Sequence, residues 1–175
     1  MKKMTGIAGG LLLIAVVFLG QSQCNEQLPH PPFDATGSYD GTWQGQTDEN
    51  TQTVAACPLQ LTLAQNVYAN FPARMHVSGT AVIDYSCFDW PEWFPPVPPS
   101  TVEVSGLMGE DKHLVLLSGG CGTGFCIVLS LDGQGEDSNN DQLMDEFCGE
   151  WKLTFLLAGV QPFGFSGTFE VVRSE

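Results

Sequence analysis

Apolar and polar residues alternate along most of the chain, at the spacing of β-strands. In residues 58–65 (PLQLTLAQ), for example, Leu59, Leu61 and Leu63 would share one face, with polar residues on the other. Successive side chains of a strand point to opposite faces, so this period-two pattern predicts strands with one buried face. We find no convincing apolar pattern at helical spacing beyond the N-terminal region. The predicted strands are residues 39–45, 58–65, 74–85, 101–107, 113–119, 125–132, 150–158 and 163–173.

Eight short strands of this kind predict an all-β fold, an eight-stranded antiparallel up-and-down meander barrel. Closure of the sheet removes exposed strand edges, which favours the barrel over its alternative, a two-sheet β-sandwich. An apolar-Ser-Gly phrase recurs in four of the runs, and glycine permits the bends that a barrel needs. The phrase therefore indicates strand curvature. It ends at Gly79, Gly106, Gly119 and Gly167.

The N-terminus predicts export from a bacterial cytoplasm. Two lysines precede the apolar run IAGGLLLIAVVFLG, which a polar stretch follows, as in a signal peptide. The run is shorter than the roughly 20 residues of a membrane-spanning helix. We predict an export signal over residues 1–23, a flexible Pro-containing leader over 24–37 and the β-barrel domain over 38–175. The protein would lie in the periplasm, at the outer membrane surface or in the medium, without a membrane span.

The first residue of the mature chain has two interpretations. Gly20 and Ser22 form a small-x-small site whose cleavage releases a chain that begins at Gln23. In the second interpretation, Cys24 is the lipidated first residue of a lipoprotein. That start leaves six cysteines in the mature chain, an even number.

An exported chain with this many cysteines is expected to form disulfides. A zinc site would need paired Cys-x-x-Cys motifs, which the sequence lacks. Cys121 and Cys126 are close enough in sequence to close a small loop. Six cysteines allow 15 pairings, so the pairing of the others stays open. The remaining candidates, near predicted strand ends, are Cys57, Cys87 and Cys148.

The chain carries 20 acidic and six basic residues, a formal net charge of −14. Without Lys2 and Lys3 of the signal, four basic residues remain and the charge is near −16. Such a surface repels nucleic acid and anionic membranes, and it attracts divalent cations and basic partners.

Residues 136–147 (EDSNNDQLMDEF) predict either a calcium loop or a solvated connection between strands. Calcium takes six to eight oxygen ligands, and alternate side chains of a tightly curled loop supply them. The spacing resembles the calcium loops of dockerins and thrombospondin type-3 repeats. A bound calcium would have a structural role. The candidate ligands are Asp137, Asn139, Asp141, the Leu143 carbonyl, Asp145 and Glu146.

Residues 87–100 (CFDWPEWFPPVPPS) combine aromatic side chains with five prolines. Proline excludes this stretch from a central strand and stiffens it, so its aromatics would be presented at low entropic cost. They would either contact a ligand or partner, or fold down as a lid over one barrel mouth. The candidate ligand contacts are Phe88, Trp90, Trp93 and Phe94, together with Trp43 of the first strand.

The tripeptide Gly41-Thr42-Trp43 resembles the Gly-x-Trp motif that opens lipocalins and related barrels of the calycin group. The phrases DGTWQG, CGEWKLTF and FSGTFEVVR are also similar to small bacterial exported barrels. The lipocalin resemblance implies that a basic side chain near the chain end, here Arg173, packs across the Trp43 indole as a cation–π contact.

No catalytic motif stands out: the chain has neither a Gly-x-Ser-x-Gly elbow nor a His-Glu-x-x-His sequence. We therefore expect a non-catalytic envelope barrel that binds a small apolar ligand inside the barrel or under the aromatic loop. The alternative is a structural or protein-interaction module of the envelope with a calcium-stabilised acidic loop. A hydrolase is a third interpretation and requires two carboxylates that converge in a cleft. The sequence indicates no cofactor other than calcium.

Overall fold

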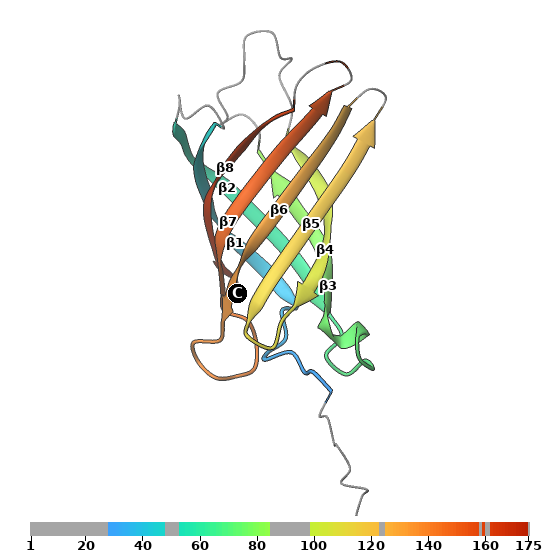
Figure 1. Cartoon of the computed structure of the whole chain (residues 1–175). Helices are drawn as coiled ribbons and strands as arrows, with labels where there is room; N and C mark the ends of the chain where they lie inside the picture. Colours follow the sequence, from blue (N-terminus) through green and yellow to red (C-terminus); the bar gives the residue numbers. More distant parts are fainter. Residues whose placement is uncertain are drawn as a thin grey trace, which may run out of the picture.

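The computed structural model describes residues 28–47, 53–84, 99–122, 125–157, 159 and 162–174. In these residues, eight antiparallel strands follow one another around a single closed barrel, and the last strand pairs with the first (Figure 1). The all-β meander barrel is thereby confirmed, and the two-sheet sandwich is wrong because one continuous sheet forms. The elements are β1 (Gly37–Thr47), β2 (Thr53–Gln65), the 3₁₀ turn η1 (Ala73–Met75), β3 (His76–Ile83), β4 (Ser100–Met108), β5 (His113–Gly122), β6 (Phe125–Glu136), β7 (Glu146–Leu157) and β8 (Phe163–Arg173).

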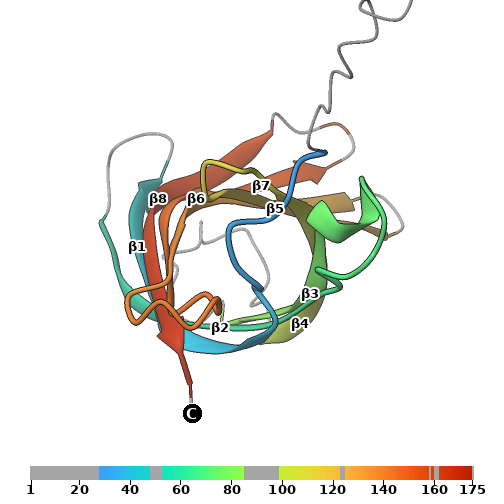
Figure 2. The ribbon, with the colours of Figure 1, turned by 90° about the horizontal axis from the view of Figure 1, so that it is seen from below.

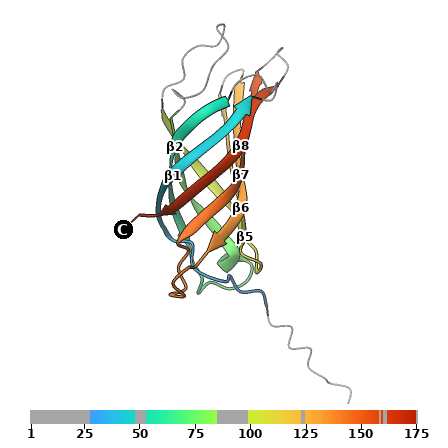
Figure 3. The ribbon, with the colours of Figure 1, turned by 90° about the vertical axis from the view of Figure 1, so that its left-hand side faces the viewer.

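The period-two pattern places the predicted runs in these strands. Leu59, Leu61 and Leu63 of β2 are all buried, and the polar residues between them are exposed. The predicted run 74–85 begins too early, because Met75 lies in η1 and β3 starts at His76. Met75 is nevertheless buried. The strands wind around the barrel axis at a marked tilt (Figure 3).

Aromatic side chains form much of the barrel interior. The Trp43 and Trp151 rings lie 4.8 Å apart between centroids, and Phe147 meets Phe169 edge to face at 4.7 Å. Such pairs contribute about 0.5–1.5 kcal/mol beyond the burial of their area. The largest fully buried side chains include Tyr39, Trp43, Phe147, Trp151, Phe155 and Phe165.

Glycine in the apolar-Ser-Gly phrase marks places where neighbouring strands approach closely. A Cβ atom at Gly79 would meet the carbonyl oxygen of Thr62, and one at Gly106 would meet that of Val115. The phrase on β5 differs, because a Cβ atom at Gly119 would have no neighbour within 4 Å in the part of the chain that the structure describes. The sheet is therefore tight at the first two positions and open at the third.

The segment before β1 closes the lower end of the barrel in the view of Figure 1. Figure 2 shows it crossing that opening. Phe33 and Ala35 are buried in the core, and the backbone nitrogen of Ala35 donates to Gln65 Oε1 over 2.9 Å. Arg74 Nε donates to the carbonyl oxygen of Pro29 over 2.6 Å. Residues 28–36 of the predicted leader are thus packed against the barrel.

Candidate functional site

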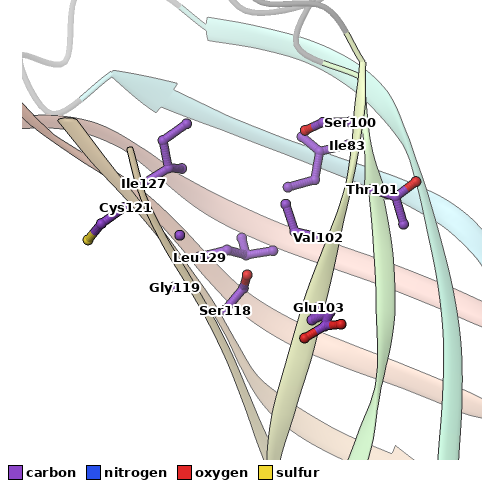
Figure 4. Close-up of a pocket in the computed structure, with 11 residues that line it drawn as sticks. Ile83, Ser100, Thr101, Val102, Glu103, Ser118, Gly119, Cys121, Ile127 and Leu129 are labelled. Atoms are coloured by element: carbon purple, nitrogen blue, oxygen red, sulfur yellow. The ribbon is translucent and has the colours of Figure 1, made fainter. Parts of the chain in front are cut away.

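A chamber of about 490 Å³ lies at the upper end of the barrel, opposite the end that the N-terminal segment closes. It is bounded by β3, β4, β5 and β6. Figure 4 shows the side chains of Ile83, Val102 and Leu129 directed into the space between β4 and β5. The lining residues are Ile83, Ser100, Thr101, Val102, Glu103, Ser118, Gly119, Gly120, Cys121, Ile127 and Leu129.

The chamber opens sideways through a seam between β4 and β5. Their ladder has four pairs, from Ser105 opposite Leu117 to Met108 opposite Leu114. By contrast, β3 and β4 form eight pairs, and β5 and β6 form ten. Beyond the Ser105–Leu117 pair, the two strands form no further ladder pair in the described residues. Figure 4 shows them diverging towards the upper end. We call this upper, unpaired part the open seam.

Each edge of the open seam is supported from behind. Ser100 still pairs with Ile83 of β3, and Cys121 pairs with Cys126 of β6. A disulfide joins Cys121 to Cys126 and ties the β5–β6 hairpin beside the seam. Both edges are therefore held extended although they do not pair with each other.

The lining is mostly neutral. Among the described lining residues, Glu103 is the one ionisable side chain other than the disulfide-bonded cysteine, and it is exposed. Ser100, Thr101 and Ser118 add hydroxyl groups beside the apolar side chains. A site of this composition suits a group that is largely apolar, with hydrogen-bonding atoms at the rim.

The sequence did not single out this chamber. The alternation of apolar and polar residues in β3, β4 and β6 does place four of the lining side chains on the inner face: Ile83, Val102, Ile127 and Leu129. The shortened β4–β5 ladder leaves no such signal in the sequence, because the alternation of β4 continues through Thr101 and Glu103, where the strand no longer pairs with β5.

The predicted ligand contacts divide into two groups. Trp43 is fully buried and packs against Trp151, so it belongs to the core of this structure. Phe88, Trp90, Trp93 and Phe94 lie outside the described residues. Cys24 and the predicted export signal also lie outside them.

The acidic loop is closed by hydrogen bonds from its own backbone. The nitrogens of Asp141 and Gln142 donate to the two carboxylate oxygens of Asp137, over 3.2 and 3.0 Å. Ser138 donates to Asp145 through both its backbone nitrogen and its hydroxyl, over 2.8 and 2.7 Å. These bonds hold the pKa of Asp145 below its usual value.

Other members of the candidate calcium set are also engaged. Asn139 Nδ2 donates to Asp141 Oδ2, and the backbone nitrogen of Leu143 donates to Asp141 Oδ1. Glu146 lies in β7, opposite Glu136. Within the described ranges, no group of three or more His, Cys, Asp or Glu side chains is arranged to hold a metal ion. Calcium binding by this loop stays a prediction.

The same loop helps to close the barrel. Asp34 donates from its backbone nitrogen to the Gln142 carbonyl, and Met144 donates to the Asp34 carbonyl, over 2.8 and 2.9 Å. Met144 is fully buried. The loop therefore holds the N-terminal segment in place, a function that its polar sequence does not indicate.

The expected contact between Arg173 and Trp43 is wrong in its partner. Arg173 lies opposite Tyr39 in the β1–β8 ladder, whereas Trp43 lies opposite Phe169. The guanidinium group accordingly stacks over the Tyr39 ring, 5.2 Å from its centroid. The physical reason is the register of the ladder, which places Arg173 four residues along β1 from the position opposite Trp43.

The cysteines follow the disulfide prediction in part. The Cys121–Cys126 bond is confirmed, and Cys57 is engaged in a disulfide as well. Cys148 is a free, half-buried thiol, so its expected disulfide is wrong. The reason is its register: on β7 it lies opposite Gln134 and Glu170, neither of which is a cysteine. Cys87 lies outside the described residues.

No family model, no curated protein and no solved structure matches this chain. Among the residues that the structure describes, no helix has the length and apolarity needed to cross a membrane.

Proposed function

We propose that this protein is a non-catalytic, exported binding protein of the cell envelope that holds a small apolar ligand in the upper chamber. The observation that carries this proposal is the chamber itself. Its volume of about 490 Å³ lies within the range of about 300–1,000 Å³ that is typical of small-molecule sites. Ile83, Val102, Ile127 and Leu129 supply the apolar lining.

The distribution of side chains supports the upper end as the site. The interior is filled by aromatic side chains such as Trp43, Trp151 and Phe147, and the N-terminal segment closes the lower opening. The Cys121–Cys126 disulfide supports an oxidising compartment, because such bonds are rare in the cytosol. The closed meander barrel is consistent with a calycin-like fold, and kinship with lipocalins is part of the proposal.

A structural or protein-interaction module of the envelope is the second candidate. The filled aromatic interior favours it, since a barrel without a bound ligand needs a solid core. The two functions differ in whether an apolar compound binds with a defined stoichiometry.

The test is a titration of the purified mature protein with N-phenyl-1-naphthylamine, a neutral dye whose fluorescence rises in apolar surroundings. Ile127→Phe adds bulk inside the chamber. Val128→Phe is the matched control, because Val128 is the next residue of β6 and is 37% exposed on the outer face. We expect saturable binding of one dye per chain, weakened at least tenfold by Ile127→Phe and less than twofold by Val128→Phe.

Two results would count against a ligand-binding function. One is the absence of saturable binding to a protein that unfolds cooperatively, which would favour the structural module. The other is equal weakening by both substitutions, which would place the dye outside the chamber.

A further inference from the structure

The open seam leaves two strand edges that face each other, and no other described strand lies between them. Within the described chain, β4 from Ser100 to Val104 and β5 from Ser118 to Gly122 form no ladder pairs across it. Strands carry N–H and C=O groups along both edges, and an unpaired edge is a template for a further strand. Both edges are already extended, because β3 and β6 hold them from behind.

The seam also has room at the backbone. Among the described residues, no atom lies within 4 Å of a Cβ position at Gly119 or Gly120. In the closed part of the same seam, a Cβ atom at Gly106 would meet the Val115 carbonyl oxygen. The two strands thus change from contact to an opening within a few residues.

The chamber lies directly behind the open seam. Ile83, Val102 and Leu129 point into it (Figure 4). A strand added at the seam would direct every second side chain inward, and apolar residues at those positions would fit this lining.

We propose that the open seam takes up an extended peptide segment with alternating apolar and basic side chains, which adds a strand to β4 or β5. Its backbone pairs with the free edges, and its apolar side chains enter the chamber. This inference rests on the proposed function, since it needs a chamber that accepts apolar groups.

Charge determines the kind of peptide. Glu103 stands at the seam, and the whole chain has 20 acidic residues against six basic ones. Basic side chains on the outer face of the added strand are therefore favoured. A second copy of this chain would bring the same acidic surface and is disfavoured. A bare aliphatic chain is also disfavoured at the edges, because it would cover backbone groups without replacing their hydrogen bonds to water.

The test uses the purified mature protein and the synthetic peptide acetyl-Lys-Val-Lys-Val-Lys-Val-Lys-amide. A second peptide carries N-methyl groups on its valines, which blocks pairing along one edge. A third has the same composition without alternation. We expect the dissociation constant of the first peptide to be at least tenfold lower than those of the other two, measured by fluorescence anisotropy of dye-labelled peptides. Hydrogen exchange should slow at least tenfold within residues 100–104 and 118–122.

Variants test the charge and the chamber. Glu103→Gln should weaken binding of the first peptide about threefold or more, whereas Glu170→Gln, on the outer face of β8, should leave it within experimental error. Ile127→Phe should weaken binding of the first peptide, as it is expected to weaken binding of the dye.

The two proposals fail in different ways. Dye binding that is sensitive to Ile127→Phe, combined with equal binding of all three peptides or with protection away from the seam, would overturn the peptide proposal alone. Loss of both dye and peptide binding in a folded protein would overturn the proposed function as well.

Discussion

Arg173 and Tyr39 face each other across the β1–β8 ladder, and the guanidinium group of Arg173 lies over the Tyr39 ring. The same group donates to the carbonyl oxygens of Thr36 and Met144, over 2.7 and 2.8 Å, and to the Tyr39 hydroxyl over 3.1 Å. The Tyr39 hydroxyl also lies 2.9 Å from the carbonyl oxygen of Ala35. One pair therefore joins the first strand, the last strand, the N-terminal segment and the acidic loop.

Removing the guanidinium group should destabilise the fold. Arg173→Met keeps the stem of the side chain but removes the charged donor from the carbonyl oxygens of Thr36 and Met144. Hydrogen bonds that involve a charged group contribute about 1.5–3 kcal/mol. We expect the free energy of unfolding to fall by about 2–4 kcal/mol, measured by urea denaturation. Arg173→Lys should recover only part of this loss, because a lysine lacks the planar fork. A loss below about 0.5 kcal/mol for Arg173→Met would contradict this role.

Alkaline pH should destabilise the fold through Tyr39. Burial raises the pKa of Tyr39 to about 12, although the charge of Arg173 opposes the shift. The folded state thus favours the protonated phenol. The stabilisation is complete below pH 10, the ordinary pKa, and is lost as the pH rises from 10 through 12. Two pKa units correspond to about 2–3 kcal/mol. Urea denaturation at pH 9 to 12 should show this decline in the wild type and a smaller one in Tyr39→Phe.

Much of the fold could be predicted because burial of one sheet face leaves a period-two record. Leu59, Leu61 and Leu63 alternate with polar residues and are buried together. The same alternation also occurs before the first predicted strand. Phe33 and Ala35 alternate with Asp34 and Thr36, and both are buried at the lower end of the barrel. That alternation would have indicated an ordered segment before Gly37.

The register and the open seam could not be predicted in this way. Alternation determines which side chains point inward, but it does not say which residue lies opposite which. Arg173 was therefore expected on Trp43 and lies on Tyr39. Likewise, the alternation places Val102 on the inner face of the sheet, but it does not show that β4 no longer pairs with β5 at Val102. The register and the open seam both depend on pairing between segments that lie far apart in the sequence.

Calcium binding by the acidic loop can be detected as a change in the melting temperature of the protein. Asp137 and Asp141 already accept backbone N–H bonds, so a cation would have to share these oxygens, and weak binding is expected. If the loop binds calcium, the melting temperature should be higher in 5 mM calcium than in chelator, and Asp141→Asn should abolish the difference. Asp40→Asn, on β1, is the control that should preserve it. Equal melting temperatures for the wild type in calcium and chelator would contradict the prediction.

The free thiol of Cys148 should react slowly. Burial raises its pKa, and the nearby carboxylates of Glu146, Glu170 and Glu136 raise it further. Less thiolate is then present at pH 8, and the thiolate is the reactive form. Alkylation by iodoacetamide, followed at Cys148 by peptide mass spectrometry, should be severalfold slower than for a free peptide. Glu146→Gln should accelerate it, whereas Glu103→Gln should not. Equal rates for Cys148 and the free peptide would count against this environment.

Glycine substitutions on the two sides of the β4–β5 seam should have opposite outcomes. In the closed part, the added Cβ atom of Gly106→Ala would meet the Val115 carbonyl oxygen, which belongs to the backbone and cannot move without disturbing the ladder. We expect Gly106→Ala to lower the free energy of unfolding by about 2–4 kcal/mol or to prevent folding, as overpacking and strain do. Gly120→Ala adds the same atom to the open part, where no atom of the described chain lies within 4 Å.

The expected change for Gly120→Ala is within about 0.5 kcal/mol, or a slight gain, since alanine restricts the unfolded chain more than glycine does. Urea denaturation of both variants and the wild type gives the comparison, and far-UV circular dichroism verifies that each retains its strands. Should Gly106→Ala fail to fold, the small effect of Gly120→Ala still tests the opening. A loss of 2 kcal/mol or more for Gly120→Ala would mean that β4 and β5 pack together along their whole length, and neither the chamber entrance nor the free strand edges would then exist.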